Sequence, residues 1–152
     1  MNKVNLLISS CLLSNKVRWD GKILNIPEID VLNKYFNLIP ICPEVDSGLS
    51  IPRLPSEIKD GKVINSNNED VTSYFIKGSE IAFDIAKKYN IKYALLKDKS
   101  PSCGSSLIYD GSFKGITKIG EGFTTKKLKE LDIKIYNEDQ IDQLIQDAIE
   151  EN

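Results

Sequence analysis

The pattern that most constrains the fold is an alternation of short apolar runs with segments of helical periodicity. The apolar runs at residues 4–10, 37–41, 92–97 and 133–136 have the length and composition of buried strands. Between the second and third runs, apolar residues recur at helical spacing over residues 70–89. Strands that alternate with helices pair in parallel, because each helix returns the chain to the same end of the sheet. The sequence therefore predicts an α/β, Rossmann-like three-layer domain with a mostly parallel sheet.

The remaining segments predict how the strands are connected. We expect a helix from Pro27 to about Phe36, followed after the second strand by a long structured loop over residues 42–56. The turn sequence at residues 59–62 predicts a hairpin between two short strands. Two more helices are expected, one at residues 125–131 and one that starts at Asn137 with Gln140 in a variant of the capping box.

The size and charge of the chain narrow the class of protein. Its 152 residues are typical of one domain, so residues 1–152 are interpreted as a single unit. A net charge of −2 argues against a general nucleic-acid surface or an anionic-membrane surface, since both need a basic excess. No apolar run approaches the ~18 residues of a membrane span, and the first residues do not resemble a signal peptide. We therefore expect a cytoplasmic protein that binds neither membranes nor nucleic acids in general.

Two residue types that are absent or scarce restrict the chemistry. The chain has no histidine, which excludes serine–histidine and cysteine–histidine hydrolase mechanisms and every histidine zinc site. Arginine occurs only as Arg18 and Arg53, and all other basic residues are lysines. Because lysine supplies a plain positive charge elsewhere, we expect the two arginines where a planar, bidentate donor is needed, such as the recognition of a substrate anion or carbonyl.

Three cysteines follow the ends of three predicted strands: Cys11, Cys42 and Cys103. In a parallel sheet these ends lie at one edge, which is where ligands bind. The odd number and the reducing compartment argue against a disulfide framework. A structural zinc would need a carboxylate as its fourth ligand. A [4Fe–4S] cluster fits three thiolates better, because it can leave one iron open to a substrate.

Other interpretations of these residues remain open at this point. Cysteine is among the most frequently buried residues, so the thiols could be incidental to a nucleotide-binding module. A cluster-free thiol or persulfide carrier of sulfur, with Cys103 as its reactive group, is a second alternative. The small residues of the loop at 100–105 could also cradle a phosphate with backbone N–H groups, although the loop matches no standard phosphate-binding motif.

The motifs around the cysteines closely resemble the thiouracil desulfurase family. The resemblance extends from about Val4 to Tyr136, with the motifs in the same order. The sequence departs from the family pattern in three places. Ser14 stands where glycine is expected, Trp19 stands where tyrosine is usual, and the proline-rich stretch reads Pro52-Arg53-Leu54-Pro55-Ser56-Glu57. The matching segments are Ser9–Leu13, Val17–Gly21, Ile41–Val45, Pro52–Pro55, Asp70–Thr72, Lys99–Gly104 and Ile108–Gly111.

The resemblance implies a cofactor and a reaction. It implies a [4Fe–4S] cluster bound by Cys11, Cys42 and Cys103, with one open iron. The implied enzyme is a desulfurase that hydrolyses the C–S bond of thiouracil-type pyrimidines, without net redox change, to uracil and hydrosulfide. The family's catalytic residues map onto Glu44, as general base and acid, and onto Ser100, which would position the attacking water. The open iron would make the ring carbon electrophilic.

Further residues are expected to bind the small thiolated pyrimidine. We predict substrate-binding roles for Ser102, Arg18 and Arg53. Three aromatic residues could stack on the pyrimidine ring, although core packing is the more ordinary role for each of them. They are Trp19, Tyr109 and Phe113.

Overall fold

The central feature of the fold is a four-stranded parallel sheet. The structure is a computed structural model that describes residues 3–151. The strands are paired in the order β2-β1-β5-β8, and all three pairings are parallel. The alternation of strands and helices in the sequence therefore gives the predicted α/β fold, and this prediction is confirmed. The strands span Val4–Ser9 (β1), Phe36–Ile41 (β2), Tyr93–Leu95 (β5) and Lys134–Tyr136 (β8).

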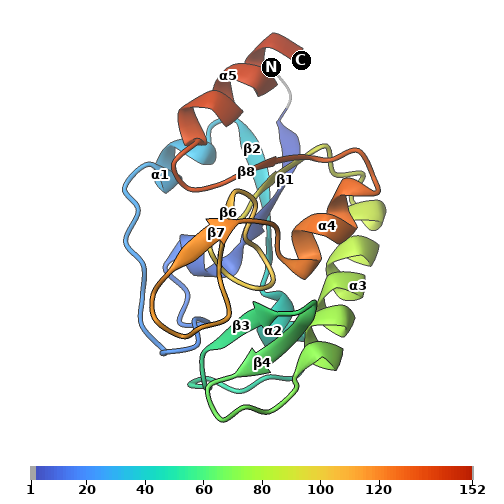
Figure 1. Ribbon diagram of the computed structural model, residues 1–152. Coiled ribbons are helices and arrows are strands. Elements are labelled where there is room, and N and C mark those ends of the chain that lie inside the picture. Colours follow the sequence, from blue (N-terminus) through green and yellow to red (C-terminus); the bar gives the residue numbers. More distant parts are fainter. Residues whose placement is uncertain (1–2, 152) are drawn as a thin grey trace.

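Helices cover both faces of this sheet and make three layers (Figure 1). Helices α1 (Ile29–Leu32) and α5 (Ile141–Glu151) pack on one face. Helices α3 (Thr72–Lys88) and α4 (Phe123–Lys129) pack on the other face.

Strand β1 shows why the first apolar run is continuous rather than alternating. Leu6 and Ile8 belong to the hydrophobic cluster under α1 and α5, whereas Leu7 belongs to the cluster under α3 and α4. All three side chains are fully buried. A strand that is covered on both faces needs an apolar residue at every position, and this is the pattern that marked it in the sequence.

The edge position of β2 explains how a strand can contain proline. Pro40 lies opposite Ile8 in the register of β1 and β2. Proline has no N–H to donate, and β2 is the outermost strand of the sheet, where a missing donor is tolerated.

Three predicted elements differ from the structure. The helix expected from Pro27 to Phe36 covers only α1, because Phe36 begins β2 and packs edge-on against Tyr93 in the core. The segment 42–56 is not entirely loop, since α2 (Pro43–Asp46) opens it with proline at the first helical position. The last helix starts at Ile141 rather than at Asn137, since Asn137 and Gln140 bond to each other in the preceding turn.

Two antiparallel hairpins complete the fold. The first consists of β3 (Ser56–Lys59) and β4 (Lys62–Asn65), and it confirms the hairpin prediction. Its turn residues Asp60 and Gly61 both have positive φ, 51° and 78°, as a tight hairpin turn requires. The second consists of β6 (Leu107–Tyr109) and β7 (Thr117–Ile119). Strand β7 was not predicted, because it is short and largely exposed and so lacks a buried face that would pattern its sequence.

Helix length and polarity also bear on membranes. Among the described residues 3–151, no helix combines the length and the apolar character needed to cross a bilayer.

Candidate active site

The three cysteines all line one cavity at the carboxyl edge of the parallel sheet. Cys11 lies in the 3-10 turn Ser10–Leu13 that follows β1, Cys42 follows β2 directly, and Cys103 lies in the loop after β5. The cavity has a volume of about 380 Å³. Parallel pairing carries the three strand ends to the same edge, so thiols that are far apart in sequence meet there.

Tight packing of two helices holds Cys42 in place. Cys42 precedes α2, and its backbone N–H donates to the Asp46 carboxylate at 3.1 Å. Helix α3 presses against α2 at Gly78, where an added Cβ would lie only 2.3 Å from the carbonyl oxygen of Pro43. Glycine at this position therefore permits the close approach that fixes Cys42 and Glu44 at the cavity.

Backbone N–H groups organise the loop that carries Cys103. The carboxylate of Asp98 accepts hydrogen bonds from the N–H groups of Ser105, Ser106 and Leu107 at 3.0–3.2 Å. Burial alone would raise the pKa of Asp98, but these N–H donors hold the pKa below its usual value. Asp98 is therefore ionised near neutral pH, and its charge fixes the loop.

The surroundings of the thiols disfavour their ionised form when no cation is bound. Burial raises the pKa of both Cys11 and Cys103 to about 12, and burial also raises the pKa of Cys42. A reactive carrier thiol needs a lowered pKa and access to solvent. A metal centre, in contrast, displaces the thiol proton by binding the sulfur. The cavity therefore suits metal ligation better than a cluster-free persulfide carrier.

The spacing of the acidic and thiol groups bears on the kind of metal centre. Over residues 3–151, no three Cys, Asp or Glu side chains converge closely enough to hold a single metal ion. An iron–sulfur cluster takes each thiolate on a separate iron, so thiols spread around one cavity fit it.

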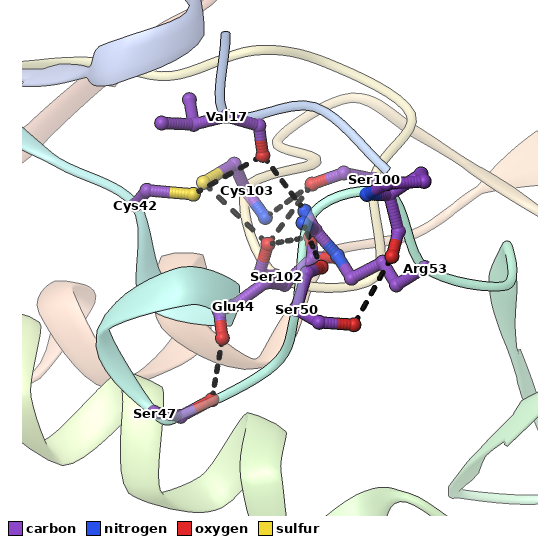
Figure 2. A network of polar contacts seen from close by, with 10 residues as sticks. Val17, Cys42, Glu44, Ser47, Ser50, Arg53, Ser100, Ser102 and Cys103 are labelled. Carbon is purple, nitrogen blue, oxygen red and sulfur yellow. Dashed lines mark hydrogen bonds and ion pairs between the residues drawn. The ribbon is translucent and has the colours of Figure 1, made fainter. Parts of the chain in front are cut away.

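Glu44 lies at the centre of a hydrogen-bond network beside the thiols (Figure 2). Its Oε1 accepts from Nε of Arg53 at 3.2 Å, and its Oε2 accepts from Oγ of Ser102 at 2.8 Å. The Ser102 hydroxyl also lies 3.7 Å from the sulfur of Cys103. The carboxylate is thus held in one orientation next to a cysteine.

Ser100 is joined to the same network through Ser102. The two hydroxyl oxygens are 3.2 Å apart, and Oγ of Ser100 accepts the backbone N–H of Cys103 at 2.7 Å. Ser102 is almost fully buried, with 1% of its surface exposed. Both serines line the cavity together with Glu44.

The two arginines have different surroundings. The guanidinium group of Arg53 donates to Glu44, to the carbonyl of Ser50 at 3.1 Å and to the carbonyl of Val17 at 3.0 Å. The three nitrogens of the group each bond to a different acceptor of the protein itself, so the guanidinium does not make the bidentate contact that was expected. Arg18 lines the cavity and is paired with Asp20 at 3.5 Å.

Residues that the sequence analysis did not single out also line the cavity. Lys97 comes two residues after β5, and its ammonium group lies 2.7 Å from the carboxylate of Glu138. The rule that ligands bind at strand ends could have found it. Glu57 reaches the cavity from β3, which belongs to a hairpin outside the parallel sheet, so that rule gave no signal for it.

The three candidate aromatic residues all line this cavity. The exposed fraction is 43% for Trp19 and 37% for Phe113, so neither ring is part of the packed core. Tyr109 is the last residue of β6 and is half-buried. Core packing, the more ordinary role, therefore does not account for Trp19 or Phe113.

Comparisons with known proteins agree with this site. The family model for 2-thiouracil desulfurase matches residues 6–140. The uncharacterized protein YbbK of Bacillus subtilis (strain 168) is 32% identical over 150 residues, which cover 92% of this chain and 99% of YbbK. The solved structure of the [4Fe-4S]-dependent thiouracil desulfidase TudS has a TM-score of 0.91 and 37% identity, and the match covers 99% of this chain and 100% of TudS. The family that the motifs predicted is therefore confirmed, and this chain belongs to the 2-thiouracil desulfurase family.

Proposed function

We propose that this protein is an iron–sulfur-dependent desulfidase that converts thiouracil-type pyrimidines to uracil and hydrosulfide without net redox change. The observation that carries the proposal is one cavity that joins three thiols, one of them buried and two half-buried, to a hydrogen-bonded carboxylate, in a chain of the 2-thiouracil desulfurase family. The similarity to TudS, a [4Fe-4S]-dependent thiouracil desulfidase, supports the same activity.

The donor set of the cavity suits a [4Fe–4S] cluster. Cys11, Cys42 and Cys103 would hold three of its irons and leave the fourth without a protein ligand. When bound, such a cluster supplies a Lewis acid that polarises the thiocarbonyl group of the substrate.

The residues of the chain then provide the proton transfers. Glu44 takes a proton from water as the water oxygen bonds to the ring carbon that carries sulfur. Glu44 returns that proton to the sulfur as the C–S bond breaks. The hydroxyl proton of the adduct leaves to solvent as the C=O bond forms, so that water and a thiocarbonyl give a carbonyl, hydrosulfide and one proton, with no electron donor or acceptor. The bonds from Ser102 and Arg53 fix the orientation of the Glu44 side chain for the first step.

The remaining polar groups of the cavity position the water and the substrate. Ser100, which is 3.2 Å from Ser102, lies where its hydroxyl can orient the attacking water. Ser102 and Arg18 are proposed to contact the pyrimidine. The contacts of Arg53 favour an indirect role. Arg53 bonds to Glu44 and to the backbone carbonyls of Val17 and Ser50 at the same time, and so fixes the position of the Glu44 carboxylate.

The decisive test is preparation of the protein without oxygen. We expect a brown protein with iron and acid-labile sulfide close to four of each per chain, which converts 2-thiouracil to uracil and sulfide. A colourless protein without iron that still transfers sulfur from a persulfide donor would establish the carrier alternative. Nucleotide binding that survives removal of all three cysteines, without desulfidase activity, would establish the nucleotide-binding module.

A further inference from the structure

The backbone conformation of Phe113, a residue that lines the cavity, is not explained by hydrophobic packing. Phe113 has a φ of 59°, in the left-handed region that bulky side chains rarely adopt. Of the described residues other than glycine that have positive φ, Phe113 alone is apolar. Its side chain is 37% exposed and belongs to none of the hydrophobic clusters formed by residues 3–151. Packing of Phe113 into a hydrophobic cluster therefore does not offset the strain.

A buried carboxylate holds Phe113 in this conformation. Oε1 of Glu57 accepts the backbone N–H of Gly111 at 3.0 Å and that of Phe113 at 3.2 Å. Glu57 is only 8% exposed, and within residues 3–151 it forms no ion pair. Burying a carboxylate is costly unless strong hydrogen bonds compensate. Here the compensating donors are the N–H groups of the β6–β7 loop (residues 110–116), which form an anion-binding concavity.

The β6–β7 loop also lies close to the backbone of β3. Gly111 has a φ of 95°, and an added Cβ there would lie 2.9 Å from the carbonyl oxygen of Ile58. The carboxylate of Asp110 accepts the N–H of Ser112 at 2.9 Å. Hydrogen bonds to the N–H of Phe113 and to the N–H groups of the two residues before it therefore fix its position, and Phe113 lines the cavity that contains the thiols and Glu44.

A strained residue that its surroundings hold in place, with its side chain on a cavity wall, is a sign of function rather than of packing. Flat aromatic rings offer a stacking surface to a nucleobase. We propose that Phe113 is a substrate-binding residue on which the pyrimidine ring stacks, and that Glu57 is the positioning residue that holds it in place. This inference rests on the proposed desulfidase function. Trp19 and Tyr109 line the same cavity without positive φ, so the structure singles out Phe113 among the three.

The test measures binding separately from turnover. Uracil, which lacks the sulfur and is not consumed, is titrated by calorimetry into the iron-loaded protein. We expect Phe113→Leu to weaken uracil binding by about fivefold or more, as expected for loss of base stacking. Phe113→Tyr should bind as the wild type does. With 2-thiouracil, Phe113→Leu should raise KM and leave kcat nearly unchanged, because stacking is present before and during the reaction. Tyr89→Leu removes an exposed ring away from the cavity and serves as the matched control.

A second variant separates function from folding. Phe113→Gly removes the ring and suits the left-handed backbone, so Tm should not fall although uracil binding is lost. A lower Tm would show that the ring supports the fold, and it would overturn the proposal.

The role of Glu57 is tested by rescue and by non-additivity. Glu57→Gln keeps an oxygen that can accept both N–H groups, so it should bind uracil nearly as well as the wild type, whereas Glu57→Leu should weaken binding as Phe113→Leu does. The double variant Glu57→Leu/Phe113→Leu should bind no more weakly than either single variant, because both changes remove the same contact. Additive losses would show that Glu57 does not act through Phe113.

The outcomes also distinguish this inference from the proposed function. If the wild type desulfurates 2-thiouracil but Phe113→Leu binds uracil as tightly as the wild type, the stacking role is wrong and the desulfidase stands. If the wild type binds uracil through Phe113 but produces no sulfide, the pyrimidine site stands and the proposed reaction is wrong. If the wild type does not bind uracil, the stacking proposal is overturned.

Discussion

The parallel sheet and the two hairpins contribute different kinds of residues to the same cavity. The ends of β1, β2 and β5 and the segments that follow them supply the thiols, Glu44 and the serines. The hairpins supply Glu57, Tyr109 and Phe113. In this fold the reactive groups therefore come from the sheet edge, which every parallel α/β domain has, whereas a wall for the substrate ring comes from the added hairpins. A change at the edge should affect chemistry, and a change in a hairpin should affect binding or stability.

The largest effect is expected from loss of a thiol at the sheet edge. Replacement of Cys11, Cys42 or Cys103 with alanine should abolish the visible absorption and the activity together, because two thiolates hold a cluster poorly. The fold should persist, since its core is large enough without a metal. Anaerobic iron analysis and far-UV circular dichroism on each variant check this. A single variant with full iron content and turnover would remove that cysteine from the ligand set.

The next effect concerns proton transfer at the same edge. Glu44→Gln keeps the size of the side chain, and its amide can still bond to both neighbours, with its oxygen accepting from Arg53 and its NH2 group donating to the Ser102 hydroxyl, but it cannot take a proton from water at neutral pH. Turnover of 2-thiouracil should fall by about 10²–10⁴-fold while the iron content stays the same. Single-turnover measurement of uracil release checks the prediction. Loss of iron would instead show that Glu44 supports the metal centre, and turnover within a few-fold of wild type would exclude it as the base.

The arginine contacts predict a smaller effect that also distinguishes two nearby residues. Arg53→Lys keeps the charge but loses the three-way contact with Glu44, Val17 and Ser50, so kcat should fall by about tenfold with iron retained. Arg18 is proposed to contact the pyrimidine and has a single protein ion pair of 3.5 Å, so Arg18→Lys should raise KM and should lower kcat less than Arg53→Lys does. Steady-state kinetics of both variants check which of them has the lower kcat. Equal values of kcat would show that Arg53 does not position Glu44.

The smallest effect is expected at the turn of the β3–β4 hairpin, whose residues Asp60 and Gly61 do not line the cavity. Gly61 has a φ of 78° in the turn between β3 and β4, and a Cβ there would meet no atom within 4 Å. Gly61→Ala should therefore lower the free energy of unfolding by about 1 kcal/mol through backbone strain alone, and Tm by about 2–4 °C. Thermal unfolding checks this, with Gly61→Asn as a milder control, and kcat should not change. A loss of activity would show that the hairpin is coupled to the reacting groups.

The sequence predicted the residues at the carboxyl edge of the parallel sheet well, because short segments of the sequence are enough to identify them. Each buried strand was visible as an apolar run, and Cys11, Cys42 and Cys103 could be placed by their distance from those runs. The family motifs covered the same residues, which is why the family was predicted correctly. The helix before β2 was too long in the prediction, because the apolar residues that lead to Phe36 fit a helix and a buried strand equally well.

The partners of the site residues could not be predicted, because they depend on tertiary contacts. No local pattern indicates that Arg53 reaches Val17, or that the carboxylate of Glu57 accepts an N–H group from Phe113. The substrate-binding role predicted for Arg53 and the catalytic roles of Glu44 and Ser100 stay predictions until the variants above are measured. The single-domain assignment and the cytoplasmic location also stay predictions.

The contact between Gly78 and Pro43 has a consequence for how variants of this protein are interpreted. Alanine is usually the most conservative replacement within a helix, so a Gly78→Ala polymorphism would ordinarily be scored as harmless or even beneficial. Here the new methyl group would meet the Pro43 carbonyl, and the helix could only move away by displacing the segment that carries Cys42 and Glu44. A screen for loss of desulfidase activity should therefore recover substitutions at Gly78, although this residue lies in helix α3, which carries no reactive group. Such a screen would identify the residues outside the cavity on which the activity depends.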